Sequence, residues 1–322
     1  MMGFAALATH AVLSMGLGWW VVRRGSPQVR VIICVISVAV ATAAPLAFPA
    51  SWSPVRFIAF IAGFALFGKL LDTARNTIES PEMGERLGLY LLWAALIPDT
   101  GWYADSAQKR RHQKAAIGAL LRGTGALGAI FALLMLDSVV SLHDNRWIST
   151  FWMVWVFYFS AVAAIELPGV PFQLMGLRIV PILRCPPLAR SPRDFWSRRW
   201  NRWFKRLAHA HIFTPLGGAH RPLIGASAVF LVSATVHEAL TWASLGQVDG
   251  RMFAFFCIHG VATIATTTLA KSMNRRLLMP RGPAVLLHLA WITLTGPLFF
   301  GPINDVFQLT TWSGALRGGL GF

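Results

Sequence analysis

The residues best equipped for chemistry in this chain are His237 and Glu238, which stand together inside a long apolar stretch. A polar residue inside a membrane-crossing segment is a functional-site hypothesis by default, because placing it there costs free energy. Burial keeps an imidazole neutral at pH 7 and able to accept a proton, so His237 has the chemistry of a general base. The alternative is a histidine that only forms a hydrogen bond between helices.

A stripe of polar residues accompanies this histidine. Ser233, His237 and Thr241 are spaced by four, and Ser244 follows three residues later. On a helix these residues share one face, which we expect to point to the bundle interior or a cavity. Glu238 is rotated away from the stripe by about 100°, and it must be protonated, paired or hydrated.

Two further histidines stand in apolar stretches. His259, in FFCIHGV, could line the same cavity as His237. His288 is similar but has fewer polar neighbours in sequence, so it is a weaker candidate.

A basic and aromatic segment, SPRDFWSRRWNRWFKRL, precedes the apolar stretch at residues 191–207. On a single helix over 193–207, Trp196, Trp200, Trp203 and Leu207 would share one face, and the basic residues would line another. This pattern is typical of an amphipathic helix in the cytoplasmic membrane interface, with the tryptophans as anchors.

Asp194 and Asn201 do not belong to the tryptophan face of that helix. They are seven residues apart and would share a face. Asp194 could pair with Arg198, four residues further on. Asn201 offers both a hydrogen-bond donor and an acceptor.

The composition indicates what must hold these residues in place. Only 13% of the 322 residues are charged, 55% are hydrophobic, and the mean hydropathy is +0.56. Soluble domains carry about 25% charged residues. The apolar runs are continuous, and several approach the length needed to cross hydrocarbon. We therefore predict an all-α, polytopic helical membrane protein forming a single domain over 1–322.

Charge bias between the apolar runs predicts the topology. About eight spans with both termini outside place every strongly basic loop on the cytoplasmic side. The short piece at 87–98 is then re-entrant or interfacial rather than spanning. The first run is expected to be a retained helix rather than a signal peptide. The expected spans are 4–22, 31–48, 57–71, 123–142, 147–167, 222–243, 252–269 and 284–300.

The net charge of +16 would suggest nucleic acid in a soluble protein. Here the basic residues lie between apolar runs, which favours cytoplasmic loops touching anionic lipid, so no nucleic acid is expected. A basic face could also attract an acidic substrate such as a nucleotide-bearing thioester. The cysteines form no CxxC pair, so neither a metal site nor a redox motif is expected.

The order of these motifs resembles a known family. PPLARSPRDFWSRRWNRWF is followed about 30 residues later by SATVHEAL and then by FFCIHGV. This order is similar to the wax synthase branch of the membrane-bound O-acyltransferases, which carry a DFW-x-RRWN segment, an H-E pair in an apolar helix and an FFxxHG segment. The resemblance covers about residues 183–262. Ser197 departs from the glycine that many plant members have.

The resemblance implies transfer of an acyl group from acyl-coenzyme A to the hydroxyl of a lipophilic alcohol. His237 would be the catalytic general base, and Asn201 would assist. No bound cofactor or obligate protein partner is expected, and the partners are acyl-coenzyme A, the alcohol and membrane lipids. The expected membrane is the bacterial inner membrane. The expected substrate contacts are Asp194, Arg198, Arg199, Trp200, Ser233, Glu238, Thr241 and His259.

The sequence leaves two alternatives open. The donor could be acetyl-coenzyme A and the acceptor a sterol, terpenoid or other secondary metabolite. The protein could instead be a small-molecule transporter whose polar stripe lines a path. A transporter favours broken helices in repeated halves, and the sequence has no internal repeat.

Overall fold

A computed structural model describes residues 26–74, 100–101, 106–272 and 279–320. The chain forms two compact units, each described by itself. The first unit comprises Met1–Trp102 and Thr235–Gly250, and the second comprises Tyr103–Ala234 and Arg251–Phe322.

The described part of the chain is built of helices, and seven of them are long and apolar enough to cross a membrane. The predicted all-α, polytopic membrane fold is confirmed. The seven helices match the second to eighth predicted spans, whereas the predicted span 4–22 and the piece 87–98 lie outside the described residues. The seven ranges are Gln28–Ala47, Ser53–Asp72, Gln108–Val140, Arg146–Leu174, Pro222–Leu245, Arg251–Ala270 and Arg281–Phe307.

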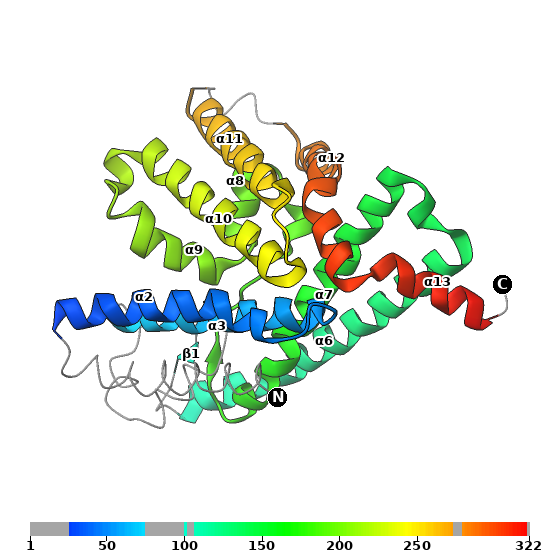
Figure 1. Ribbon diagram of the computed structural model, residues 1–322, viewed down its shortest axis with the longest axis horizontal. Coiled ribbons are helices and arrows are strands. Elements are labelled where there is room, and N and C mark those ends of the chain that lie inside the picture. Colours follow the sequence, from blue (N-terminus) through cyan, green and yellow to red (C-terminus); the bar gives the residue numbers. More distant parts are fainter. Residues whose placement is uncertain (1–25, 75–99, 102–105, 273–278, 321–322) are drawn as a thin grey trace. The chain divides into compact units, whose positions relative to one another are not determined.

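The first unit contains α2 (Pro27–Ala43), η1 (Ala44–Ala47), α3 (Ser53–Ala74), β1 (Thr100–Gly101) and the end of α10 (Pro222–Leu245). Helices α2 and α3 lie side by side (Figure 1). A Cβ on Gly63 would lie 3.0 Å from Ala41, so glycine permits their close approach. Arg56 closes the turn between them by donating from Nε and Nη2 to the carbonyl of Phe48, at 3.0 and 2.7 Å.

The second unit contains the remaining elements. The long helices are α6 (Ser106–Val140), α7 (Arg146–Leu174), α11 (Arg251–Ser272), α12 (Arg281–Phe307) and the first part of α10. The shorter elements are η2 (Leu142–Asp144), β2 (Arg178–Ile179), η3 (Pro186–Leu188), α8 (Pro192–Asp194), η4 (Phe195–Arg199), α9 (Arg202–Ala208), η5 (His209–Phe213), η6 (Gly218–His220) and α13 (Leu309–Leu320).

Helices α6 and α7 pack along each other as a long hairpin (Figure 1). Because α6 begins at Ser106, the basic cluster QKRRHQK at 108–114 forms its first turns. Arg122 on α6 donates from Nε and Nη2 to the two carboxylate oxygens of Glu166 on α7, at 3.1 and 2.9 Å. This paired geometry satisfies two charges within the apolar hairpin.

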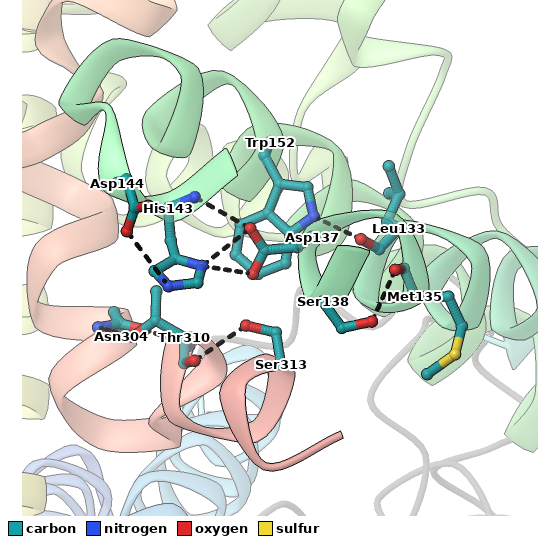
Figure 2. Close-up of polar contacts among 10 residues, drawn as sticks. All are labelled: Leu133, Met135, Asp137, Ser138, His143, Asp144, Trp152, Asn304, Thr310 and Ser313. Carbon is teal, nitrogen blue, oxygen red and sulfur yellow. Dashed lines mark hydrogen bonds and ion pairs between the residues drawn. The ribbon is translucent and has the colours of Figure 1, made fainter. Parts of the chain in front are cut away.

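The turn of this hairpin is held by the carboxylate of Asp137, whose side chain is fully buried (Figure 2). It accepts hydrogen bonds from the backbone N–H of His143 at 2.9 Å and contacts Nδ1 of the same residue at 3.0 Å. Trp152 on α7 donates from Nε1 to the carbonyl of Leu133 on α6, at 2.9 Å. The contacts with Asp137 give His143 a structural role at the end of α6.

Candidate active site

The motif segment at 192–208 is not the single helix that the sequence predicts. It consists of α8, the π-helical turn η4 and α9, with a break at Trp200 and Asn201. Asn201 takes a left-handed conformation, with φ 34°, which asparagine tolerates better than most residues. Its Oδ1 accepts a hydrogen bond from the N–H of Phe204 at 3.1 Å and so caps α9. The predicted helix over 193–207 is therefore wrong, because Asn201 begins a new helix.

The break also separates the predicted faces. Trp196 packs against two neighbouring helices: its indole lies 5.8 Å from the ring of Phe230 on α10 and 5.5 Å from that of Phe256 on α11. Trp203 on α9 is buried. The tryptophans that the sequence groups as one lipid-facing stripe thus serve different contacts.

Asp194 pairs with Arg199 rather than with the predicted Arg198. Nε of Arg199 donates to Oδ2 of Asp194 at 2.8 Å. The reason is the π-helical turn, in which the N–H of Trp200 bonds to the carbonyl of Phe195, five residues back. A turn of this kind brings position i+5, not i+4, over position i.

The electrostatic setting of Asp194 favours its charged form. Partial burial disfavours the carboxylate, but the hydrogen bond from Arg199, the N–H of Arg190 and the charges of both arginines outweigh it. Together they hold the pKa of Asp194 below its ordinary value.

Two arginines of the motif fix the segment against the preceding loop. Arg199 donates from Nη1 to the carbonyls of Arg184 and Cys185 at 3.3 and 3.2 Å. Arg202 donates from Nη1 to the carbonyl of Pro181 at 3.0 Å. By contrast, Arg198 and Lys205 are exposed.

Asn201 keeps one hydrogen-bonding group available. Its oxygen is used by the cap of α9, and its Nδ2 donates to no other described residue. This orientation follows from the hydrogen-bond pattern, since only the oxygen can accept from Phe204. The side chain can therefore act on a ligand as a donor.

His259 is fixed in one protonation pattern by its neighbours. Trp196 donates from Nε1 to Nδ1 of His259 at 3.1 Å, and indole N–H can only donate, so Nδ1 is the acceptor. Nε2 of His259 then carries the hydrogen and lies 2.9 Å from Oγ1 of Thr295, which donates to the carbonyl of Trp291 at 2.9 Å. With no exposed surface and both nitrogens occupied, His259 links the motif to α12.

A cavity of about 60 Å³ lies beside this chain of hydrogen bonds, within the second unit. Its wall is mostly aromatic and comes from the motif and from α7, η3, α11 and α12. Phe195 and Trp200 stack with ring centroids 5.6 Å apart, and Phe157 lies 5.7 Å from Trp200. Among the wall residues are Phe157, Phe195, Trp196, Trp200, His288 and Phe300.

His288, the weaker candidate of the two further intramembrane histidines in the sequence, lies in this wall. It is 3% exposed, and neither of its ring nitrogens has a hydrogen-bond partner among the described residues. Its ring centroid lies 5.5 Å from that of Phe195. An intramembrane histidine in LLHLAWITL was the available signal, but only the fold places it beside the motif.

His237 lies on the part of α10 that belongs to the first unit and is half-buried. Neighbouring positions Val236, Ala239, Leu240 and Ala243 pack against Phe60 of α3 and its neighbours. The hydroxyls of the polar stripe bond within their own helix: Ser233 donates to the carbonyl of Val229, Thr241 to that of His237 and Ser244 to that of Leu240.

Glu238 is not left unpaired in the apolar stretch. Its Oε1 accepts hydrogen bonds from the N–H groups of Asp249 and Gly250, at 2.9 and 2.8 Å. Glu238 therefore holds the loop that follows α10. These hydrogen bonds offset the cost of burying its carboxylate.

Asn201 belongs to the second unit and His237 to the first, so their union in one site stays a prediction. Trp200 and His259 border or adjoin the aromatic cavity, and Asp194 and Arg199 form the ion pair beside it in the motif. Among the described residues, no group of three or more histidine, cysteine, aspartate or glutamate side chains is arranged to hold a metal ion.

Comparison with known proteins gives these motifs a context. The sequence profile described as the membrane bound O-acyl transferase family matches residues 180–258. An acyl-CoA–sterol O-acyltransferase of Arabidopsis thaliana is 23% identical over 255 residues, covering 76% of this chain and 73% of that protein. A probable long-chain-alcohol O-fatty-acyltransferase of the same plant is 32% identical over 143 residues, covering 41% and 42%.

A long-chain-alcohol O-fatty-acyltransferase of Simmondsia chinensis is 26% identical over 137 residues, covering 40% of this chain and 39% of that enzyme. Apart from the sterol acyltransferase, these relatives are thus matched over less than half of their own length. The profile and the relatives confirm the predicted resemblance to the wax synthase branch, an enzyme class of O-acyltransferases in the membrane.

Proposed function

We propose that this chain transfers an acyl group from acyl-coenzyme A to the hydroxyl of a long-chain alcohol, with His237 as general base and Asn201 as a hydrogen-bond donor. The observation that carries the proposal is the family match over residues 180–258, which includes both residues in one motif order. The Nδ2 of Asn201, which donates to none of the described residues, supports the proposed role of Asn201 as a donor.

The reaction is a direct transfer between two bound substrates. His237 takes the hydroxyl proton, and the alcohol oxygen attacks the carbonyl carbon of the thioester. The carbon–sulfur bond then breaks, and the thiolate of coenzyme A takes the proton from the imidazolium. A positioned general base contributes about 10²–10⁴-fold to the rate.

Asn201 acts on the charge that develops during the attack. Its oxygen is committed to the cap of α9, so Nδ2 is the group that donates to the oxyanion. One such donor contributes about 10²–10³-fold.

The coenzyme A head group is assigned to the exposed basic side chains of the motif. Arg198 and Lys205 are exposed, whereas Arg199 and Arg202 hold backbone carbonyls. Guanidinium and ammonium groups bind phosphate oxygens through charge-assisted hydrogen bonds. On this proposal the motif faces the cytoplasm, the source of acyl-coenzyme A, and the membrane is the bacterial inner membrane.

A sterol is the second candidate acceptor. The observation in its favour is the acyl-CoA–sterol O-acyltransferase relative, which aligns over 76% of this chain. A sterol, terpenoid or similar acceptor with acetyl-coenzyme A as donor is the corresponding alternative.

The proposal is tested in membranes or detergent with the purified full chain. Acyl-coenzyme A donors from acetyl to palmitoyl are crossed with long-chain alcohols, sterols and diacylglycerol, and the esters are quantified. We expect most ester from a long-chain acyl donor and a long-chain alcohol, and a loss of at least about 10²-fold for His237→Ala. Full turnover by a folded His237→Ala variant would overturn the base assignment, and vesicle uptake without any ester would favour a transporter.

A further inference from the structure

The aromatic cavity of the second unit holds a polar group that the proposed mechanism does not use. His288 on α12 is 3% exposed, and neither Nδ1 nor Nε2 has a partner among the described residues. A buried polar group without a partner costs about 1–3 kcal/mol. Most buried polar atoms in proteins are paired, so such a residue calls for an explanation.

His259, one helix away, shows what a structural histidine looks like in the same unit. Both of its nitrogens are occupied, by the indole of Trp196 and the hydroxyl of Thr295. His288 makes neither kind of hydrogen bond within the described part of the chain, and it borders the cavity. The two histidines therefore differ: His259 links structural elements, whereas His288 lines the cavity and its buried nitrogens have no hydrogen-bond partner among the described residues.

The cavity limits what can occupy that space. Its volume of about 60 Å³ exceeds that of one water, for which about 10–15 Å³ suffices by the same kind of measure. A buried water needs two to four polar partners, whereas the wall is dominated by rings such as Phe157, Phe195 and Phe299. The space suits the end of a slender apolar molecule that carries one polar atom.

The hydrogen-bonding groups of the imidazole indicate which polar group such a molecule would carry. The charged groups that act on His288 are Asp194 and Arg199, and these two already neutralise each other through a 2.8 Å hydrogen bond. A neutral imidazole offers one donor and one acceptor, and a hydroxyl offers both as well. A thioester carbonyl can only accept, and its nucleotide would meet no charged side chain in the wall.

We propose that this cavity binds the hydroxyl end of the alcohol acceptor and that His288 is its hydrogen-bonding partner. The inference rests on the proposed acyl transfer and adds the place and the residue that select the acceptor. Phe195 and Trp200, which belong to the family motif, would then pack against the first carbons of the alcohol. No covalent step is assigned to His288: it donates to the hydroxyl oxygen, and the hydroxyl proton is left for the general base of the proposed transfer.

The first test separates binding from turnover. His288→Phe keeps a flat ring and removes both nitrogens, while His288→Gln restores a donor and an acceptor. We expect His288→Phe to raise the KM for the alcohol about tenfold, the loss of roughly one hydrogen bond, with little change in the KM for acyl-coenzyme A. His288→Gln should recover part of the loss. His220→Gln, at an exposed position of the second unit, is the matched control.

The second test does not need ester formation. A long-chain alcohol bearing a diazirine near its hydroxyl is photolysed with the full-length protein, and the labelled peptides are identified by mass spectrometry. We expect labels in 195–200 and 284–300 that an unlabelled alcohol displaces and that His288→Phe diminishes. The variant should be no less stable to heat than the wild type, because the nitrogens it removes have no described partner.

The outcomes distinguish this inference from the proposed function. Labelling of the cavity without any ester would support the site and overturn the acyl transfer. Ester formation with an unchanged alcohol KM in His288→Phe, or with labels only elsewhere, would overturn the site and leave the acyl transfer intact. A larger effect on acyl-coenzyme A than on the alcohol would assign the cavity to the donor and also overturn the inference.

Discussion

Trp196 donates its indole N–H to Nδ1 of His259 across 3.1 Å, and this contact joins the π-helical turn of the motif to α11. Because indole N–H is only a donor, it sets the tautomer of His259 and directs Nε2 to Thr295 on α12. Three elements are thereby tied by one chain of hydrogen bonds inside an apolar bundle. A histidine so occupied is poorly suited to accept a substrate proton.

Trp196→Phe tests how much the hydrogen bond between Trp196 and His259 contributes to stability. Phenylalanine retains most of the ring contacts but leaves Nδ1 of the fully buried His259 without its donor. We expect a loss of about 1–3 kcal/mol in stability, the usual cost of orphaning a buried acceptor. Thermal unfolding in detergent measures it. Trp312→Phe, whose side chain belongs to a residue 65% exposed, is the control, and equal shifts for both variants would contradict the role of the link.

The pairing of Asp194 with Arg199 predicts a dependence of stability on pH. The pKa of Asp194 is lowered by Arg199 and by the N–H of Arg190 against the effect of partial burial. A lowered carboxyl pKa adds stability that is fully present above the unfolded value of about 3.9 and is lost as pH falls through the folded value. Between pH 5 and 8 this contribution is therefore constant.

Asp194→Asn removes that contribution. We expect the variant to melt at a lower temperature than the wild type near neutral pH, and the difference to shrink as the pH falls below about 4. Thermal midpoints recorded from acid to neutral pH measure it. Asp144→Asn, at a side chain 76% exposed, should show little of either effect. A difference between Asp194→Asn and wild type that does not vary with pH would argue against the charge as its cause.

Much of the fold follows from apolar runs, because a continuous stretch of that length has few structures open to it in a bilayer. The seven described spans were predictable on that basis, as was the all-α class. The π-helical turn was not. A wheel of 100° per residue assumes i+4 neighbours, and so it paired Asp194 with Arg198 instead of Arg199 and treated Asn201 as mid-helix rather than as a cap.

The candidate site was predictable only where local sequence carries the signal. His259 and His288 both stand in apolar helices, and the sequence favours His259 because His288 has fewer polar neighbours. The two histidines differ in their tertiary contacts. His259 forms hydrogen bonds with Trp196 and Thr295, whereas His288 lines a cavity. Contacts between residues more than 30 positions apart cannot be derived from helical periodicity.

Asn201 caps α9 through its side-chain oxygen and is proposed to act as a donor through Nδ2. Two variants separate these roles. Asn201→Asp keeps an oxygen for the N–H of Phe204 but loses the amide donor. We expect kcat to fall about 10²–10³-fold with a nearly unchanged thermal midpoint. Asn201→Ala should lose a similar rate and also about 1 kcal/mol of stability, the cost of a missing N-cap. Full kcat in Asn201→Asp would reduce Asn201 to a cap.

The division of the motif arginines predicts which of them recognise coenzyme A. Arg198 and Lys205 are exposed, while Arg199 and Arg202 are bonded to backbone carbonyls of the preceding loop. We expect Arg198→Gln combined with Lys205→Gln to raise the KM for acyl-coenzyme A about tenfold at low ionic strength. Added salt should narrow the gap, because exposed charges are screened over about 8–10 Å.

Acyl-coenzyme A donors of different chain length test whether the two side chains act on the head group of coenzyme A. Acetyl- and palmitoyl-coenzyme A share the same phosphates, so the double variant should raise both KM values by a similar factor and leave the KM for the alcohol unchanged. Arg146→Gln, at an exposed arginine beside the ring of Trp147 at the start of α7, is the control. If only the long-chain donor were affected, the two side chains would be acting on the acyl chain or the membrane rather than on coenzyme A.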